Sequence, residues 1–436
     1  MDPSVLSIAP MIQWTDRHYR FMMRQITRKT LLYTEMTMDT ALIHNYDPPS
    51  RLEPFIGHDA IEYPLALQLG GKNPETLAKA TSICESFGEY HEINLNSGCP
   101  SKTAKSVGFG AELMWEPPDR IREIVYAMNR VATRTEITVK CRIGTTPGRS
   151  AEQGSGAGYH WSDLERYVDA VRSAGTRRIV VHARTCVLRG LSPAQNRTVP
   201  PLQYDVVYRL AHAFPDMQFV VNGGVLSLDQ AERLLTGTCA DHCCGTNVET
   251  GTDVGASQPL PLHGCMIGRE AYNNPWIFVD ADKRFFGAHQ GSEEEDGHRT
   301  PRRRDVLEAY MDYAVRMQDS GAFGTNTPNI LKPLHNFFAG CYSSAPASQG
   351  SILGLNDTGE QVPLYDINGD VARAIKHENR VIVSHSKLYK QKLDTLVKRQ
   401  TRVGGAHVCD SSDLTLRDLV LTALDGTIPD WFLDAT

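Results

Sequence analysis

The sequence has no long hydrophobic run and no excess of positive charge. No stretch of the chain approaches the roughly 18 apolar residues that a transmembrane helix needs, so we expect no membrane-spanning segment. The start, Met1-Asp2-Pro3, lacks the basic and apolar regions of a signal peptide, so we expect no export signal. The formal net charge of −6 gives no overall indication of a nucleic-acid partner, so any basic surface must be local.

Regular cysteine spacing is also absent. Ten cysteines are scattered along the 436 residues, and without an export signal this pattern indicates reduced thiols in a cytoplasmic or organellar compartment. A hydrophobic content of 41% with 8% aromatic residues is typical of a globular protein. The length predicts two or three domains.

One repeating unit extends from about residue 6 to residue 287: a short apolar run, a polar or glycine-bearing turn, and a helical stretch. Eight such runs separated by helix-sized segments predict a parallel sheet, and eight strands close a TIM (β/α)8 barrel. An open, doubly wound α/β sheet is the alternative, but no GxGxxG follows the first run. The runs are Leu6–Pro10, Leu31–Glu35, Pro64–Gln68, Glu92–Asn96, Ile137–Arg142, Arg178–His182, Gln218–Asn222 and Gly264–Gly268.

The composition turns acidic and glycine-bearing around Ser292–Gly297, which indicates a linker. We therefore expect the barrel at residues 1–290, the linker at 291–300, and a smaller, all-helical C-terminal domain at 301–436.

The C-terminal pattern is helical in two places. Asp305–Gln318 carries apolar residues at helix spacing, and Asn329–Phe338 is a second candidate helix. Cys341–Tyr365 reads as a long polar loop. Val371–Val403 then carries nine basic residues against two acidic ones. Such a run is usually a solvated helix face, so it indicates RNA binding only if the enzyme context supports it.

Polar residues stand at nearly every predicted strand end. Active sites of these barrels lie at the carboxyl ends of the strands, so these positions are candidates for a site. Taken singly, each is more often a solvated rim residue. They are Pro10 and Met11, Glu35, Gln68, Asn94 and Asn96, Lys140 and Arg142, His182 and Arg184, Asn222 to Gly224, and Gly268 with Arg269.

The run Glu92–Ser101 is the most informative stretch. Asn94 and Asn96 alternate with apolar residues, so a strand places both amides on one face. Gly98 allows a turn, and the chain then presents Cys99. A free cysteine is usually a small buried hydrophobe, so its chemistry depends on what surrounds it.

Two strand ends predict a phosphate site. The turns after strands seven and eight commonly bind phosphate in these barrels, and here Gly223-Gly224 and Gly268-Arg269 offer backbone amides and a guanidinium. Tight turns alone would also explain the glycines. With an amide at Gln68 and a cation at Lys140, the set suits flavin mononucleotide (FMN), whose reduced ring is stabilised by a nearby positive charge.

At these strand ends and in the residues around them, the sequence resembles the tRNA-dihydrouridine synthase (Dus) family, specifically its A-type branch. The similarity extends over the whole predicted barrel in the order of the family. The segments that carry it are Ala9–His18, Leu31–Met36, Ala66–Gly71, Glu92–Ser101, Val139–Gly144, His182–Arg184, Gly190–Pro193, Asn222–Gly224 and Gly268–Tyr272.

The resemblance implies a reaction. NADPH reduces a tightly bound FMN, a hydride passes to C6 of a uridine in the tRNA D-loop at positions 20 and 20a, and Cys99 protonates C5. This role requires a neutral thiol, the opposite of a nucleophilic cysteine. The target base has to leave the stack to reach the pocket, and a loop over residues 101–110 would close on it.

The resemblance also assigns roles to residues. The positions expected to contact FMN are Pro10, Met11, Ile12, Gln68, Lys140, His182, Asn222, Gly223, Gly224, Gly268 and Arg269. Those expected to contact the uracil or tRNA are Asn94, Asn96, Arg142, Arg184, Ala194, Arg197, Lys387, Lys390 and Lys392. Ala194 stands where the family usually has a lysine, so one contact to tRNA is missing.

Other readings remain open. A flavin enzyme acting on a free pyrimidine, similar to dihydroorotate dehydrogenase, would leave the basic C-terminal stretch unexplained. A tRNA-binding protein without catalysis would not need Cys99. Residues 239–265 form an insertion with His242, Cys243, Cys244 and His263. Adjacent cysteines without a paired C-x-x-C make a poor zinc site, so we expect no metal. We expect a monomer.

Overall fold

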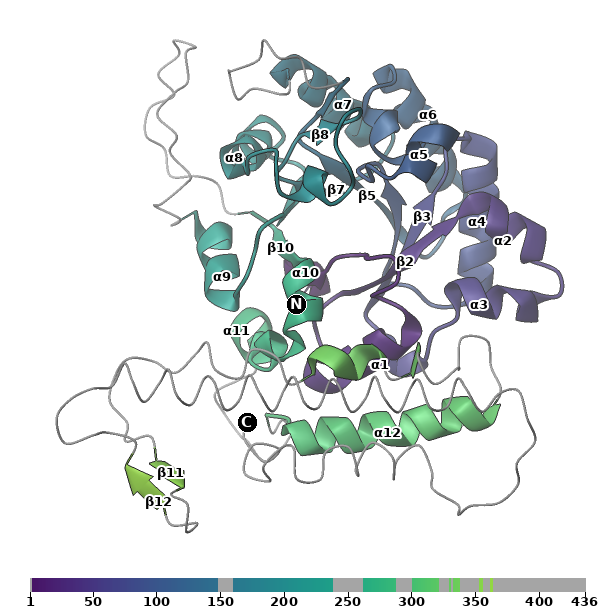
Figure 1. Cartoon of the computed structure of the whole chain (residues 1–436). Helices are drawn as coiled ribbons and strands as arrows, with labels where there is room; N and C mark the ends of the chain where they lie inside the picture. Colours follow the sequence, from purple (N-terminus) through teal and green to yellow (C-terminus); the bar gives the residue numbers. More distant parts are fainter. Residues whose placement is uncertain are drawn as a thin grey trace. The chain divides into compact units, whose positions relative to one another are not determined.

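The computed structural model describes residues 2–147, 160–237, 262–287, 300–320, 329–330, 332–337, 353–355 and 361–363. By its internal contacts the chain divides into two compact units (Figure 1). The first comprises Met1–Tyr272 and Asp280–Gly297, and the second comprises Asn273–Val279 and His298–Thr436. No helix in the described part of the chain is long and apolar enough to cross a membrane.

Eight parallel strands form the centre of the first unit. Their order is β1-β10-β9-β7-β5-β4-β3-β2. The two ends of this order meet, because the Ile8 amide donates to the Leu31 carbonyl at 3.0 Å and the Leu31 amide donates to Leu6 at 3.1 Å. The TIM barrel is thus confirmed, and the open sheet is excluded. The strands are β1 (Leu6–Ile8), β2 (Leu32–Met38), β3 (Leu65–Gly70), β4 (Glu92–Asn96), β5 (Glu136–Arg142), β7 (Arg178–His182), β9 (Gln218–Asn222) and β10 (Gly264–Ile267).

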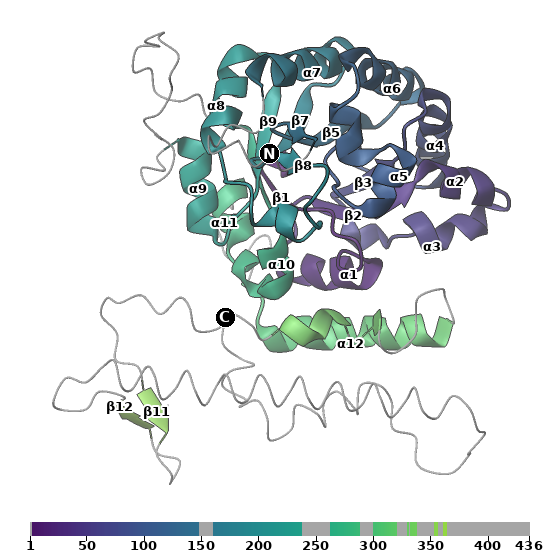
Figure 2. The ribbon, with the colours of Figure 1, turned by 45° about the horizontal axis from the view of Figure 1, so that its top comes forward.

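Helices surround the strands (Figure 2). Several begin where a side chain accepts a hydrogen bond from the first turn: Asp16 for α1, Asn73 for α4 and Ser227 for α9. The helices of this unit are α1 (Arg17–Ile26), α2 (Asp39–Asn45), α3 (Glu53–Ile56), α4 (Pro74–Phe87), α5 (Lys102–Val107), α6 (Pro118–Val131), α7 (Trp161–Ser173), α8 (Tyr204–Ala213), α9 (Leu228–Thr236), α10 (Arg269–Asn273) and α11 (Ala281–Phe286). A small parallel pair, β6 (Thr145–Thr146) and β8 (Cys186–Val187), stands apart from the barrel sheet.

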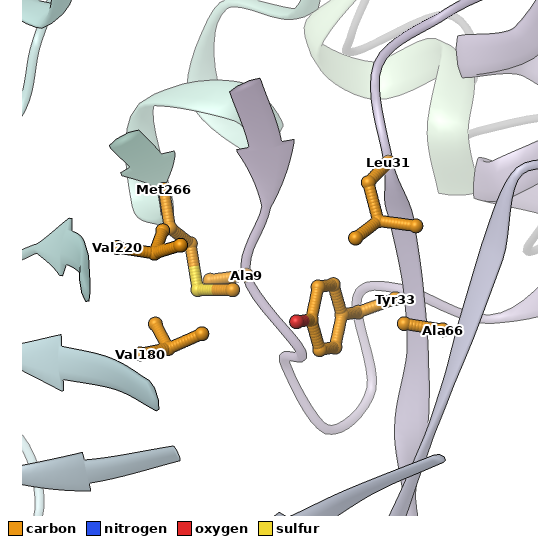
Figure 3. Close-up of a cluster of buried hydrophobic side chains, with 7 residues drawn as sticks. All are labelled: Ala9, Leu31, Tyr33, Ala66, Val180, Val220 and Met266. Carbon is orange, nitrogen blue, oxygen red and sulfur yellow. The ribbon is translucent and has the colours of Figure 1, made fainter. Parts of the chain in front are cut away.

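The interior of the barrel is partly apolar and partly polar. An apolar cluster is drawn from six strands or their ends (Figure 3): Ala9, Leu31, Tyr33, Ala66, Val180, Val220 and Met266. On β4, β5 and β7, buried polar side chains stand instead: Glu92, Asn94, Thr138 and Arg178. A buried polar group without a partner costs about 1–3 kcal/mol, so these residues are expected to bond to one another. They do, as described below.

The second unit contains α12 (Arg303–Ser320), which confirms the helix predicted at Asp305–Gln318. Its buried face includes Tyr310 and Tyr313, and the Arg303 guanidinium lies 4.2 Å from the centre of the Trp276 ring. Short 3-10 helices, η6 (Pro275–Phe278) and η7 (Lys332–Asn336), complete the described helical part.

Two antiparallel strands, β11 (Leu353–Leu355) and β12 (Gln361–Pro363), lie within the segment predicted as a loop. Strands of three residues are too short to show a period-two pattern, which is why the sequence gave no sign of them. The basic segment 371–403, with Lys387, Lys390 and Lys392, lies outside the described residues, as does the insertion from 239 to 261.

Candidate active site

Three amides meet at the carboxyl ends of β3 and β4. The Gln68 side-chain amide donates to the Asn94 oxygen at 2.9 Å, and the Asn96 amide donates to the Gln68 oxygen at 2.8 Å. Asn94 and Asn96 therefore share one face of β4, as the alternation of residues predicted. Asn94 is fully buried, and its own amide donates to Thr138. Its polar atoms are thus engaged inside the barrel.

The loop after β4 holds Cys99 by its backbone. The Asn96 oxygen accepts hydrogen bonds from the amides of Gly98 at 3.1 Å and Cys99 at 3.0 Å. The Cys99 carbonyl accepts from the Ala111 amide at 3.1 Å. Gly110 has a φ of 65°, and a Cβ there would lie 2.8 Å from the Cys99 carbonyl oxygen, so glycine is required. The half-buried thiol is therefore held by a fixed backbone.

The segment predicted as a closing loop is instead the helix α5. Its first turn is capped by Ser101, whose hydroxyl accepts from the Ala104 amide at 3.0 Å. Gly108 ends it in a left-handed conformation. The Lys105 ammonium donates to the Leu188 carbonyl, which ties α5 to the chain after β8. The prediction of a loop at residues 101–110 was wrong for residues 102–107, which form a helix that Gly108 ends; closure of this segment over the base stays a prediction.

Lys140 and Asn222 form a pair across the site. The Lys140 ammonium donates to the Asn222 oxygen at 2.9 Å, and the Asn222 amide donates to the Met266 carbonyl at 2.8 Å. Burial and, to a lesser extent, the positive charge of Arg142 together lower the pKa of Lys140 to about 8. Lys140 is therefore a cation whose charge is lost just above neutral pH.

Arg142 holds three loops together. Its guanidinium donates to the carbonyls of Gly98 at 3.0 Å, Asn196 at 2.9 Å and Thr185 at 3.2 Å. The side chain is buried, with 4% of its surface exposed. These contacts link the Cys99 loop to the segment around Asn196, so Arg142 acts on the site through the backbone that it binds.

A cluster of cations surrounds His182. Burial and then the charges of Arg142, Lys140, Arg184 and Arg269 hold the pKa of His182 well below its usual value, so the imidazole is neutral. Its Nδ1 atom is buried and has no hydrogen-bond partner in the part of the chain that the structure describes. A neutral ring with a free nitrogen, among several positive charges, suits an anionic ligand with polar groups.

Glycine is required beside this histidine. Gly223 has a φ of 118°, and a Cβ there would lie 3.2 Å from the His182 ring. Gly224 follows with a φ of 69°. The turn after β9 is therefore close to His182 because its two glycines allow it.

Met11 belongs to the turn after β1, where its amide donates to the Thr15 hydroxyl at 3.0 Å. Pro10 precedes it, and Ile12 is 56% exposed. Gln13 follows with a φ of 67°, which is uncommon for a residue other than glycine, and its amide donates to Glu35. Local strain of this kind clusters at functional sites.

The remaining cations lie at the rim. Arg184 donates to the Pro200 carbonyl, and Arg269, which follows Gly268, donates to the Arg197 carbonyl at 3.4 Å. Arg197 and Ala194 are exposed in and beside a short 3-10 helix, η5 (Gln195–Arg197). Every described candidate thus lies at the carboxyl ends of the strands or in the turns that follow them.

Sequence reasoning missed three residues that support the site: Glu92, Thr138 and Asn196. Asn196 is fully buried, its side chain bonds to both backbone groups of Val187, and its carbonyl accepts from Arg142. A charged Glu92 at the start of a strand expected to lie inside the barrel was a signal that could have been used. No group of three potential metal ligands occurs among the described residues, and His263 bonds instead to Asp2 and Ser4.

The fold and the site define a (β/α)8-barrel protein whose strand carboxyl ends combine a loop cysteine with clustered cationic and amide side chains. The family model described as dihydrouridine synthase (Dus) matches residues 7–245 of this chain.

Relatives of known name agree with this match. The chain is 42% identical over 326 residues to the tRNA-dihydrouridine(20/20a) synthase of Pseudomonas putida, covering 74% of this chain and 82% of that protein. It is 36% identical over 338 residues to the protein of the same name from Synechocystis sp., covering 77% and 84%. The Shewanella oneidensis protein of that name is 37% identical over 326 residues, covering 74% and 82%. The chain therefore belongs to the dihydrouridine synthase family.

Proposed function

We propose that this protein forms dihydrouridine in the D-loop of tRNA, at positions 20 and 20a, by reducing the C5–C6 double bond of uridine. The observation that carries the proposal is the 42% identity to a tRNA-dihydrouridine(20/20a) synthase over most of both chains. The site supports it, because the half-buried Cys99 lies near a cluster of cations suited to an anionic cofactor.

FMN is the proposed cofactor, with NADPH as its reductant. The residues present fit it: the clustered cations suit its phosphate, and the buried Nδ1 of His182 lacks a partner in the described part of the chain. When bound, FMN supplies the hydride that C6 of the uracil receives. Gly223, Gly224, Gly268 and Arg269 would hold the phosphate, Gln68 and Lys140 the ring, and Pro10, Met11, Ile12, His182 and Asn222 the rest of the cofactor.

The residues of this protein would supply the proton for C5 and hold the reacting groups in position. The Cys99 thiol donates its proton to C5, and the thiolate that remains recovers a proton from solvent. Lys140, Arg142 and Arg197 are near enough to Cys99 for an electrostatic interaction, so these three side chains belong to the same site as the thiol.

The exposure of each side chain indicates whether it can contact the substrate directly. Asn96 and Arg184 are only partly buried and would hold the uracil, whereas Asn94 and Arg142 are buried and would act through the groups they bind. Arg197, beside Ala194, would contact the tRNA at the rim, together with Lys387, Lys390 and Lys392.

The test is to map dihydrouridine by mass spectrometry in tRNA from cells that lack the gene. We expect the modification to disappear at positions 20 and 20a and to return when the gene is restored. Unchanged tRNA would contradict the proposal. Reduction of free uracil or orotate by the purified protein would favour the enzyme of free pyrimidines, and a purified protein that lacks flavin would favour the binding protein without catalysis.

A further inference from the structure

A buried carboxylate near the amino end of the barrel connects to the Cys99 loop by a run of hydrogen bonds. Glu92 opens β4, and its side chain is fully buried. The Thr138 hydroxyl donates to the Glu92 carboxylate at 3.0 Å. The Asn94 amide in turn donates to the Thr138 oxygen at 2.8 Å. The run therefore starts on β4, crosses to β5 and returns to β4.

The same run continues to the loop. Gln68 donates to the Asn94 oxygen at 2.9 Å, and Asn96 donates to the Gln68 oxygen at 2.8 Å. The Asn96 oxygen then accepts the backbone amides of Gly98 and Cys99 at 3.1 and 3.0 Å. Four side chains thus stand between the Glu92 carboxylate and the backbone of Cys99.

The donor and acceptor roles along this series of hydrogen bonds are fixed by the groups at its two ends. An ionised carboxylate can only accept, and a backbone N–H can only donate. Each side-chain amide between them therefore has one orientation that satisfies its neighbours, and the opposite orientation places oxygen against oxygen or N–H against N–H. This assigns the amides of Asn94, Gln68 and Asn96, whose oxygen and nitrogen atoms look alike in shape.

The Glu92 carboxylate is paired with Arg178, a cation that it shares with Asp2 and Glu136. Arg178, also buried, donates to the second Glu92 oxygen at 2.9 Å, and the Tyr33 hydroxyl donates to the first. A buried guanidinium would be costly without a carboxylate beside it. Tyr33 donates to the same Glu92 oxygen as Thr138 does. It is not part of the series of hydrogen bonds that reaches Cys99.

We propose that Glu92 and Thr138 are positioning residues for the reaction, holding the three amides in one orientation and, through Asn96, the backbone of Cys99. The inference rests on the proposed function only for the proton that Cys99 donates. Without the Thr138 hydroxyl, Asn94 loses its acceptor, and both Asn94 and Gln68 can turn over. Displacement of the acid by about 1 Å is enough to cost roughly 100-fold in rate.

The experiment compares T138V, T138S and Y33F in the full-length protein. T138V keeps the volume and shape of the side chain but removes the hydroxyl, T138S keeps the hydroxyl, and Y33F removes a hydrogen bond to Glu92 without interrupting the run. The first readout is the rate at which iodoacetamide alkylates Cys99, followed on its peptide by mass spectrometry. The second is the rate of dihydrouridine formation and the KM for tRNA.

We expect T138V to change the alkylation rate of Cys99 severalfold and to slow dihydrouridine formation about tenfold, equivalent to about 1.4 kcal/mol of barrier, with KM unchanged. T138S and Y33F should stay close to the wild type in both readouts. The proposal is overturned if T138V behaves like T138S, or if Y33F has the same effect as T138V, since a general loss of core stability would then explain both.

If T138V does not fold, T138A replaces it, and failure of both to fold would show that the hydroxyl serves only the fold, which also overturns the proposal. Failure of the proposed function would appear separately, as a wild-type protein that forms no dihydrouridine. The alkylation rates would still test the positioning of Cys99 in that case.

Discussion

The backbone of Cys99 is bonded on both sides while its thiol stays partly exposed. Its amide donates to Asn96, and its carbonyl accepts from Ala111. Because neither bond involves the sulfur, the loop should keep its shape when the side chain is changed. The proposed role of the thiol can therefore be tested without disturbing what surrounds it.

C99A is expected to retain flavin and to bind tRNA as the wild type does, but to lose dihydrouridine formation by a factor of about 10²–10⁴, the usual contribution of a general acid. Dihydrouridine is quantified by mass spectrometry after incubation with unmodified tRNA, and tRNA affinity is measured by filter binding. Wild-type activity in C99A would refute the acid role.

The lowered pKa of Lys140 leads to a second prediction at the residue scale, on how the affinity for FMN depends on pH. Because burial lowers its pKa to about 8, Lys140 is charged below that pH and neutral above it. An anionic ligand gains from the charge only below about pH 8, so the affinity of the flavin-depleted protein for FMN should fall as the pH rises from 7 to 9. Fluorescence titration of FMN measures this.

The matched variant is K140M, which keeps the length of the side chain without its charge. Its FMN affinity should be lower than that of the wild type at pH 7 and should change little up to pH 9, so that the two proteins converge. Parallel pH profiles for K140M and the wild type would show that another group titrates.

At the scale of secondary-structure elements, a single carboxylate on one helix holds the turn between another helix and a strand. Glu85 on α4 accepts hydrogen bonds from the amides of Thr133, Arg134 and Thr135, which form the turn between α6 and β5. Burial alone would raise the pKa of Glu85, but the hydrogen bonds from Thr133 and Arg134 outweigh it and lower the pKa to about 2. The turn that leads into the strand of Lys140 thus depends on this charge.

E85Q is expected to lower the free energy of unfolding by about 2 kcal/mol at pH 7, because an amide N–H then faces backbone N–H groups. The pKa of Glu85 is lower in the folded state, so its contribution is complete above the unfolded value of 4.5 and is lost as the pH falls toward about 2. Urea unfolding at pH 7, 4 and 3 should show the difference between E85Q and the wild type shrinking.

The exposed Glu89, just beyond the end of the same helix, provides the control. E89Q should change the unfolding free energy by no more than about 0.5 kcal/mol at any of these pH values. A difference between E85Q and the wild type that stays constant down to pH 3 would contradict the linkage to the Glu85 charge.

At the scale of the whole molecule, the acidic net charge of −6 contrasts with the proposed tRNA substrate. The basic segment 371–403, which lies outside the described residues, is the proposed tRNA contact and would account for binding despite the acidic net charge. Because counterion release from phosphates dominates nucleic-acid affinity, a local basic segment is sufficient for binding.

Changing Lys387, Lys390 and Lys392 together to glutamine should weaken tRNA binding and reduce the slope of log affinity against log salt by about 2, or roughly 0.7–0.9 per lost phosphate contact. NADPH oxidation through the flavin should not change. The control changes three exposed basic residues of the barrel unit, Lys79, Arg122 and Arg166, to glutamine. Equal losses in the two triple variants would indicate general electrostatics instead of a specific surface.

Much of the barrel could be predicted from the sequence. Strands β4, β7 and β9 begin and end where the apolar runs do, because strands buried on both faces read as continuous hydrophobic segments. The placing of polar residues at strand ends followed as well, since parallel strands bring their carboxyl ends to one side. Helix α5 and the hairpin of β11 and β12 were missed, as both are too short for a clear period.

The sequence by itself determined the number of barrel strands, their order of appearance and the residues at their ends, because these depend on local hydrophobic pattern and turn chemistry. Only the tertiary structure decided which strands are neighbours and in what register. Pairing of β4 with β5 sets Asn94 opposite Thr138, and pairing with β3 sets it opposite Gln68. Hydrogen bonds among buried side chains require that registry, so the run from Glu92 to Cys99, the role of Arg142 and the cations around His182 could not be read from the chain alone.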